Sequence, residues 1–276
     1  MDQPITKLTT LATLIGVAAF AQSTTAFAVP LQGLLSVDPG ILDSVVTASG
    51  YTVSKYAGGS YFHMNNPLSI GSTPTAGAML KPGTDQGVLL GQYQNFVLDP
   101  DVPHPQGWQG DLNGDGVPDG AAGTGYSTTP TTAANMLLPF GFFGTNTYVG
   151  TNPIAYQSGE SHPAPAADLD LSSCDTNNVC NFTLDTSAWE VMWNGSAFEQ
   201  GPRPSSKGPF VLATGTYNLD TQFYSITWDS QIKQGPFNSI HGFWHLEGTH
   251  IVPVPAAAWL LGSGLLGLIG VARRKQ

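Results

Sequence analysis

Residues 210–228 read FVLATGTYNLDTQFYSITW, and this segment carries the strongest strand signal of the chain. Two runs rich in β-branched and aromatic residues flank a polar turn at residues 218–222. In the second run Tyr224, Ile226 and Trp228 alternate with smaller or polar residues, which is the period of a strand with one buried face. The pattern predicts an antiparallel hairpin that buries these three side chains.

Similar short runs recur on both sides of this hairpin, and turn residues separate them. Between the two ends of the chain, no segment shows a sustained helical period with capping residues. These features predict an all-β fold, an antiparallel β-sandwich or jelly-roll-like domain with long loops. Besides the hairpin, we expect strands at residues 51–55, 60–64, 88–97, 181–184, 189–193 and 242–247.

The segment from about residue 99 to residue 165 differs in composition from the rest. It is rich in Gly, Pro, Thr and Asn and has only brief apolar islands. We interpret it as long loops that decorate a single sandwich. A division into two lobes, with residues 163–167 as the linker, stays open as an alternative.

The N-terminus has the order of a secretory signal peptide. Lys7 precedes an apolar stretch at residues 11–20, and the small-residue site Ala26-Phe27-Ala28 follows. This order predicts cleavage after Ala28, so that residues 1–28 are the signal peptide. An uncleaved N-terminal anchor is the alternative, but the apolar stretch is short for a membrane span.

The C-terminus combines a proline-containing segment, an apolar run and a basic end. Residues 252–259 read VPVPAAAW, and residues 260–272 carry no charge. The basic residues Arg273, Arg274 and Lys275 follow. As a helix, the uncharged run would extend about 28 Å, enough to cross a hydrocarbon core. The basic end would stay in the cytoplasm, which leaves the upstream chain outside. Residues 252–276 are therefore predicted to be a tail with a transmembrane helix.

This tail resembles the PEP-CTERM sorting signal, in its VPLPA-type variant, of proteins exported by Gram-negative bacteria. The matching residues include Val252, Pro253, Pro255, Ala256, Arg273 and Arg274. The resemblance implies recognition by an exosortase-type processing enzyme and cleavage near the Pro-Ala junction. It also implies a transient stay in the inner membrane, transfer to the cell surface, outer envelope or extracellular space, and contact with exopolysaccharide. An ordinary single-pass anchor is the alternative.

Residues 29–251 remain as the exported domain, which is long enough for a substantial core. The whole chain has 19 acidic and 9 basic residues and a formal net charge of −10. Such an acidic surface repels phosphate backbones, which excludes nucleic acid as a partner. It suits solubility outside the cell and the binding of divalent cations.

Cys174 and Cys180 are the only cysteines of the chain. In an exported protein, an even pair joined by a polar turn predicts a disulfide. Closing this short loop would stabilise the fold by about 2 kcal/mol in the chain-entropy treatment. A metal or redox pair is the weaker alternative, because the spacing is not Cys-x-x-Cys and no further cysteine completes a thiolate site.

Residues 111–120 read DLNGDGVPDG and form the best candidate for a metal site. Oxygen-bearing side chains stand at positions one, three, five and nine with Gly at six, the arrangement of an EF-hand-type Ca²⁺ loop. The segment resembles the calcium loops of dockerin and thrombospondin type 3 repeats. Because position twelve is Ala122, Asp99 or Asp101 would have to supply a further donor, and a solvated turn is the alternative. The expected ligands are Asp111, Asn113, Asp115 and Asp119, with the backbone carbonyl of Val117.

Signatures of common hydrolases are missing from the sequence, which has no Gly-x-Ser-x-Gly, no His-Glu-x-x-His and no phosphate-binding loop outside the tail. Any two of the exported domain's glutamates could form the carboxylate pair of a glycosidase. Because Glu190 alternates with Trp189 and Val191, we expect it on the opposite face of its strand. The four glutamates of the exported domain are Glu160, Glu190, Glu199 and Glu247.

Two further patterns are open to a functional interpretation. His245 and Glu247 would lie about 7 Å apart along a strand, and a surface pair is favoured over a shared metal site. Aromatic residues at strand period are expected in the core, with a sugar-stacking platform as the alternative. These are Trp189, Trp193, Tyr217, Tyr224, Trp228, Phe243 and Trp244.

The sequence therefore predicts an exported cell-surface or extracellular-matrix protein without catalytic activity. It would be sorted and processed through its tail and stabilised by calcium. The alternative is a secreted glycan-binding module or a glycan hydrolase.

Overall fold

The computed structural model describes residues 28–96, 135–155, 159–194, 196–205, 208–232, 237 and 239–252. Within these residues the chain is all-β, and the ladders between strands are antiparallel, so the predicted fold class is confirmed at this level. The predicted signal peptide (residues 1–28) and the predicted sorting tail (residues 252–276) lie outside the described residues except for Ala28 and Val252, and the predicted calcium loop lies wholly outside them. Among the described residues, no helix has the length and apolar character needed to cross a membrane.

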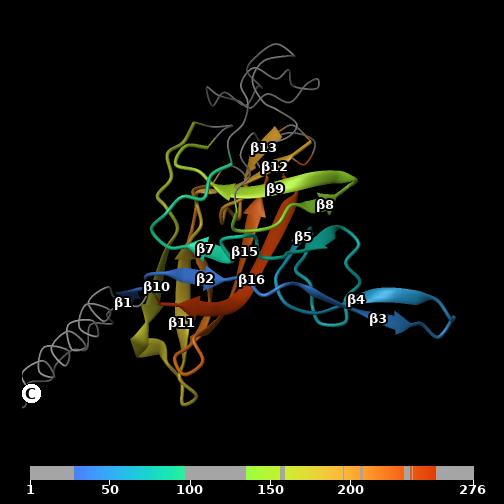
Figure 1. Ribbon diagram of the computed structural model, residues 1–276, viewed down its shortest axis with the longest axis horizontal. Coiled ribbons are helices and arrows are strands. Elements are labelled where there is room, and N and C mark those ends of the chain that lie inside the picture. Colours follow the sequence, from blue (N-terminus) through green and yellow to red (C-terminus); the bar gives the residue numbers. More distant parts are fainter. Residues whose placement is uncertain are drawn as a thin grey trace, which may run out of the picture.

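In the described part of the chain, ten strands form one large curled sheet (Figure 1). Its main path is β1 (Ala28–Pro30), β10 (Ala166–Asp170), β11 (Val179–Asp185), β14 (Ala213–Asn218), β15 (Phe223–Gln231), β16 (His241–Ile251), β2 (Leu34–Ser36) and β7 (Gly87–Leu89). β5 (Tyr61–Met64) also pairs with β16, and β6 (Gly77–Met79) pairs with β5. The short 3₁₀ helix η1 (Leu171–Ser173) follows β10.

β16 is the strand around which this sheet curls. One edge pairs with β15 over its length, while the other edge pairs first with β5 and then, near its end, with β2. Gly248 lies between these two partners, and a Cβ there would clash with the carbonyl oxygen of Ser36. A glycine at this position therefore lets β16 pass close to the β2 segment.

The predicted hairpin is confirmed by β14 and β15. Tyr217 pairs with Tyr224, and the side chains of Tyr224, Ile226 and Trp228 are buried as expected. The turn forms locally because Asn218 Oδ1 accepts hydrogen bonds from the backbone N–H groups of Asp220 and Thr221, both at 2.9 Å.

A smaller sheet joins β13 (Ser196–Glu199), β12 (Trp189–Trp193), β9 (Thr145–Thr151) and β8 (Phe140–Phe142). The interpretation of residues 99–165 as loops is therefore wrong for residues 140–151. This segment is rich in Gly, Thr and Asn and has no long alternation, so its extended state depends on pairing with β12 rather than on a local pattern. Residues 166 and 167, assigned to the alternative linker, belong to β10.

The expected strand at residues 88–97 is also shorter than predicted. Within its described residues, 88–96, only β7 at the start is a strand, because the chain turns at Gly91, whose φ of +75° suits glycine. The expected strand at 51–55 becomes β4 (Thr52–Gly58), which pairs with β3 (Ile41–Val46). This hairpin projects from the rest of the described chain at the right of Figure 1.

Three tryptophans connect the two sheets in the core. Trp189 of β12 contacts Trp228 and Trp244 of the large sheet, with ring centroids 5.2 and 5.5 Å apart. All three are buried, as are Tyr217 and Tyr224, which confirms the core assignment for these five residues. Trp193 and Phe243 are only partly buried.

Candidate functional site

The predicted disulfide between Cys174 and Cys180 is confirmed. Within its loop, Asp175 accepts backbone hydrogen bonds from Val179 and Asn177, and these bonds lower the pKa of its carboxyl group. The Asp175 side chain therefore stabilises the loop in addition to the disulfide bond.

The other site residues predicted from motifs fall outside the described residues. These are the calcium ligands Asp111, Asn113, Asp115, Val117 and Asp119, and the tail residues from Pro253 onward. At the borders, Ala28 begins β1 and Val252 follows β16. The signal peptide, the calcium loop and the sorting tail therefore stay predictions.

The smaller sheet brings two of the glutamates together. Glu190 and Glu199 are directly paired residues of β12 and β13. Glu190 alternates with Trp189 and Val191 as expected, yet it is only 1% exposed, because both faces of β12 are covered. On its face, Glu190 Oε2 accepts a hydrogen bond of 2.7 Å from Asn152 Nδ2.

Arg203 joins Glu199 to Glu160. Its Nη2 atom lies 2.9 Å from Glu199 Oε2 and 3.3 Å from Glu160 Oε2, and its guanidinium stacks 3.9 Å from the ring centroid of Phe210. The backbone of Arg203 is held by β15, since its N–H donates to the Asp229 carbonyl and its carbonyl accepts from the Gln231 N–H. The strand thus fixes the position from which the guanidinium reaches both carboxylates.

His162 completes this group, which we call the Glu160–His162–Glu199 cluster. A nitrogen of its imidazole, one carboxylate oxygen of Glu160 and one of Glu199 all lie within 4.8 Å of one another. The ring packs edge-on against Phe210 with centroids 4.7 Å apart. Burial lowers the pKa of His162, although the nearby glutamates oppose that shift, so the neutral imidazole is favoured.

The cluster is buried on one side and open on the other. His162 and Glu199 are 8% and 6% exposed, whereas the Glu160 side chain is 47% exposed. A hollow of about 510 Å³, open solvent included, reaches His162 between Asp185, Ser187 and Phe210. The arrangement offers two carboxylates and an imidazole, which are groups that hold a metal ion or transfer a proton.

The sequence analysis did not predict this cluster, although the sequence indicates one of the strand pairings near it. Asn194-Gly195 is a typical sequence of a two-residue turn, and counting outward from it pairs Glu190 with Glu199. The sequence neighbours of His162 carry no pattern that indicates a site. Its approach to Glu199 depends on the tertiary structure.

The predicted pair of His245 and Glu247 is formed, but it is partly buried rather than at the surface, with side chains 14% and 25% exposed. His245 Nε2 lies 3.1 Å from Glu247 Oε2, and the other carboxylate oxygen accepts a hydrogen bond of 2.7 Å from the Gly59 N–H. Thr227 Oγ1 lies 2.8 Å from His245 Nδ1. Both ring nitrogens are therefore engaged by protein groups, which fits the interpretation as a pair without a metal ion.

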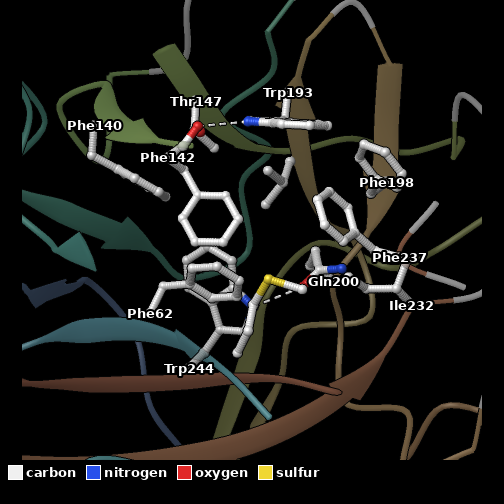
Figure 2. A pocket seen from close by; sticks show the side chains of 12 residues that line it. Phe62, Phe140, Phe142, Thr147, Trp193, Phe198, Gln200, Ile232, Phe237 and Trp244 are labelled. Atoms are coloured by element: carbon white, nitrogen blue, oxygen red, sulfur yellow. Dashed lines mark hydrogen bonds between the residues drawn. The ribbon is translucent and has the colours of Figure 1, made fainter. Parts of the chain in front are cut away.

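An apolar hollow lies between the two sheets (Figure 2). It has about 380 Å³ of space, open solvent included, and Gln200 and Thr147 are the polar residues in its described lining. Gln200 Oε1 accepts a hydrogen bond of 3.1 Å from Trp244 Nε1, and Trp193 Nε1 donates to the Phe142 carbonyl at 2.8 Å. Since no carboxylate is among these lining residues, the hollow does not provide the acid pair of a glycosidase.

The chain matches no protein-family model, and no curated protein or solved structure is significantly similar to it. Its function is therefore argued from the sequence signals and from the geometry described above.

Proposed function

We propose that this chain is an exported cell-surface or extracellular-matrix protein without catalytic activity. The observation that carries the proposal is the order of the signals along the chain: a signal peptide ending at Ala28, a β domain, and a tail from Val252 that resembles the PEP-CTERM signal. The disulfide between Cys174 and Cys180 supports export, because such bonds persist in oxidising compartments.

In this proposal, residues 29–251 fold as a β-sandwich-like domain, and residues 252–276 hold it in the inner membrane until an exosortase-type enzyme cuts the tail. The released domain resides at the cell surface, in the outer envelope or in the extracellular matrix, where exopolysaccharide is the expected partner. Ca²⁺ bound at residues 111–119 stabilises it. The acidic charge of the chain favours solubility there.

Two observations support a structural role over hydrolysis. Glu190 and Glu199 are buried, and Glu199 is paired with Arg203, so neither presents a free carboxylate to a sugar ring. Trp189, Trp228 and Trp244 are committed to the core and do not form an exposed stacking platform.

A secreted glycan-binding module or hydrolase is the second candidate. One observation favours it: oxygens of Glu160 and Glu199 approach within 4.8 Å, close to the separation of about 5 Å in retaining glycosidases. Hydrolysis of glycans by the purified protein that is lost in Glu199→Gln, with the fold intact, would replace our proposal with this one.

The test of export uses the full chain in a Gram-negative host that carries an exosortase, with an epitope inserted in the exported domain. We expect mass spectrometry of the exported protein to find an N-terminus at Val29 and no peptides from residues 260–276. A Pro255→Ala variant should accumulate in the membrane with its tail attached. Protein that stays in the cytosol with both ends attached would contradict the proposal.

A further inference from the structure

We propose that Glu160, His162 and Glu199 bind a divalent transition-metal ion of the Zn²⁺ type. This inference does not depend on export, and it uses none of the residues of the predicted calcium loop.

The geometry of the three side chains is the first observation. Their ligand atoms lie within 4.8 Å of one another, while the ligands of a tetrahedral ion at about 2.1 Å are about 3.4 Å apart. Small side-chain rotations would bring them to that spacing. Glu160 can make such a movement because its side chain is half exposed.

The second, independent observation concerns His162. Its side chain is buried, and among the described residues Nε2 has no hydrogen-bond partner. Buried polar atoms are normally paired, so this nitrogen of a residue in the Glu160–His162–Glu199 cluster requires a partner. A neutral imidazole offers a lone pair to a metal ion, which would satisfy this atom.

The charges around the cluster also favour a cation. The cluster and its neighbour Glu190 contribute three carboxylates, and Arg203 is the one arginine within hydrogen-bond distance in the described structure. A buried carboxylate such as that of Glu199 is costly unless it is paired or coordinates a metal ion. Arg203 already contacts Oε2 of both glutamates, so it would act as an outer partner that orients them toward the ion.

The three ligand atoms of the cluster determine which class of metal ion would bind. One imidazole nitrogen with two carboxylate oxygens suits Zn²⁺ and similar first-row ions, whereas Ca²⁺ and Mg²⁺ prefer oxygen ligands throughout. The hollow beside Phe210 reaches His162 of this donor set. Three protein ligands leave a further coordination position for water.

The experiment measures Zn²⁺ and Co²⁺ binding by the purified full chain after treatment with a chelator. We expect one equivalent of Zn²⁺ in competition titration, and visible absorption bands of low-symmetry Co²⁺. Glu160→Gln and His162→Gln should each weaken Zn²⁺ binding by about tenfold or more, since even changes to outer partners cost that much. A large excess of Ca²⁺ should not displace the Zn²⁺.

The matched control is His241→Gln, which alters another histidine–carboxylate pair, His241 with Asp229 at 2.7 Å. It should bind Zn²⁺ as the unaltered chain does. If His162→Gln fails to fold, Glu160→Gln decides, because the Glu160 side chain is half exposed and its loss leaves the core intact. No bound Zn²⁺, or Zn²⁺ binding that Glu160→Gln leaves unchanged, would overturn the proposal.

Discussion

Glu190 and Glu199 face each other across β12 and β13, and both side chains are more than nine-tenths buried. Like charges directly opposite on neighbouring strands destabilise a sheet, and burial adds the cost of desolvation. Each carboxylate therefore needs its own partner, and the structure supplies Asn152 for Glu190 and Arg203 for Glu199. The stability of this hairpin depends on side chains that lie outside it.

The first prediction concerns Arg203. Arg203→Met leaves Glu199 as a buried carboxylate without its cation, which should lower the free energy of unfolding by about 3–5 kcal/mol. Denaturant unfolding with a chelator present measures the change without any contribution from a bound ion. In the double variant Arg203→Met/Glu199→Met the buried charge is removed, so most of the stability should return. A single variant within 1 kcal/mol of the unaltered chain would show that the ion pair is unimportant.

The second prediction concerns the disulfide. Replacing Cys174 and Cys180 together by serine should lower the free energy of unfolding by about 2 kcal/mol, because the unfolded chain regains the entropy of the open loop. For a domain of this size the loss corresponds to a decrease in Tm of about 4–8 °C. Calorimetry under non-reducing conditions checks it, and the unaltered chain under reducing conditions should show the same shift. Equal Tm values with and without reductant would contradict the prediction.

A strand of this fold could be predicted where the residues that determine it are close together in the sequence. The hairpin of β14 and β15 was found because its alternation and its Asn218 turn are local features. β9 was missed because its extended state depends on β12, about forty residues later in the chain. β1, β2 and β6 have only three residues each, which is too short for a period to be visible.

The candidate site also has one part that the local sequence predicts and one part that depends on the tertiary structure. The pairing of Glu190 with Glu199 follows from the position of the Asn194 turn and is a local property. Glu160 and Arg203 are 43 positions apart in the sequence and come into contact only in the folded chain. Their spacing along the sequence therefore does not predict this contact. Sequence patterns therefore predicted the buried aromatic face but not the charged cluster.

The third prediction concerns the tryptophan core. Trp244 is fully buried and packs against Trp189 and Trp228, and its indole N–H donates to Gln200. Trp244→Ala should cost about 3–5 kcal/mol of unfolding free energy through the cavity that it leaves. Phe223→Ala, in the neighbouring strand but exposed, is the control and should change stability by less than about 1 kcal/mol. Similar effects for the two variants in denaturant unfolding would contradict the core assignment.

The fourth prediction is a pH dependence at Asp38. Partial desolvation and the charge of Glu247 raise the pKa of the Asp38 carboxyl group, although Asp38 is exposed. Because the folded-state pKa lies above the unfolded value, folding favours the protonated form. The contribution of Asp38 to stability is therefore complete at low pH and is lost as the pH rises through the folded-state pKa.

The variant Asp38→Asn should thus be more stable than the unaltered chain at neutral pH and no more stable below the unfolded pKa of about 4. Because Asp38 is exposed, screening by solvent should keep this gain small. Asp43→Asn, a substitution of the same kind in the projecting β3–β4 hairpin, is the control. Tm measured across this pH range checks the prediction, and a gain that is independent of pH would contradict it.

The fifth prediction tests the calcium loop, which lies outside the described residues. If Asp111, Asn113, Asp115 and Asp119 bind Ca²⁺, the ion stabilises the folded state by about 2.7 kcal/mol at a concentration one hundred times its Kd. Removing it with a chelator should then lower Tm, and adding back Ca²⁺ alone should raise Tm again by about 5–10 °C. Asp115→Asn should have the lower Tm already and should not respond to added Ca²⁺. Glu160→Gln should keep the full response, because its cluster has the nitrogen and oxygen donors of a different ion. A Tm that is unchanged by the chelator, together with no Ca²⁺ in elemental analysis, would rule out the loop as a metal site and leave residues 111–120 as a solvated turn.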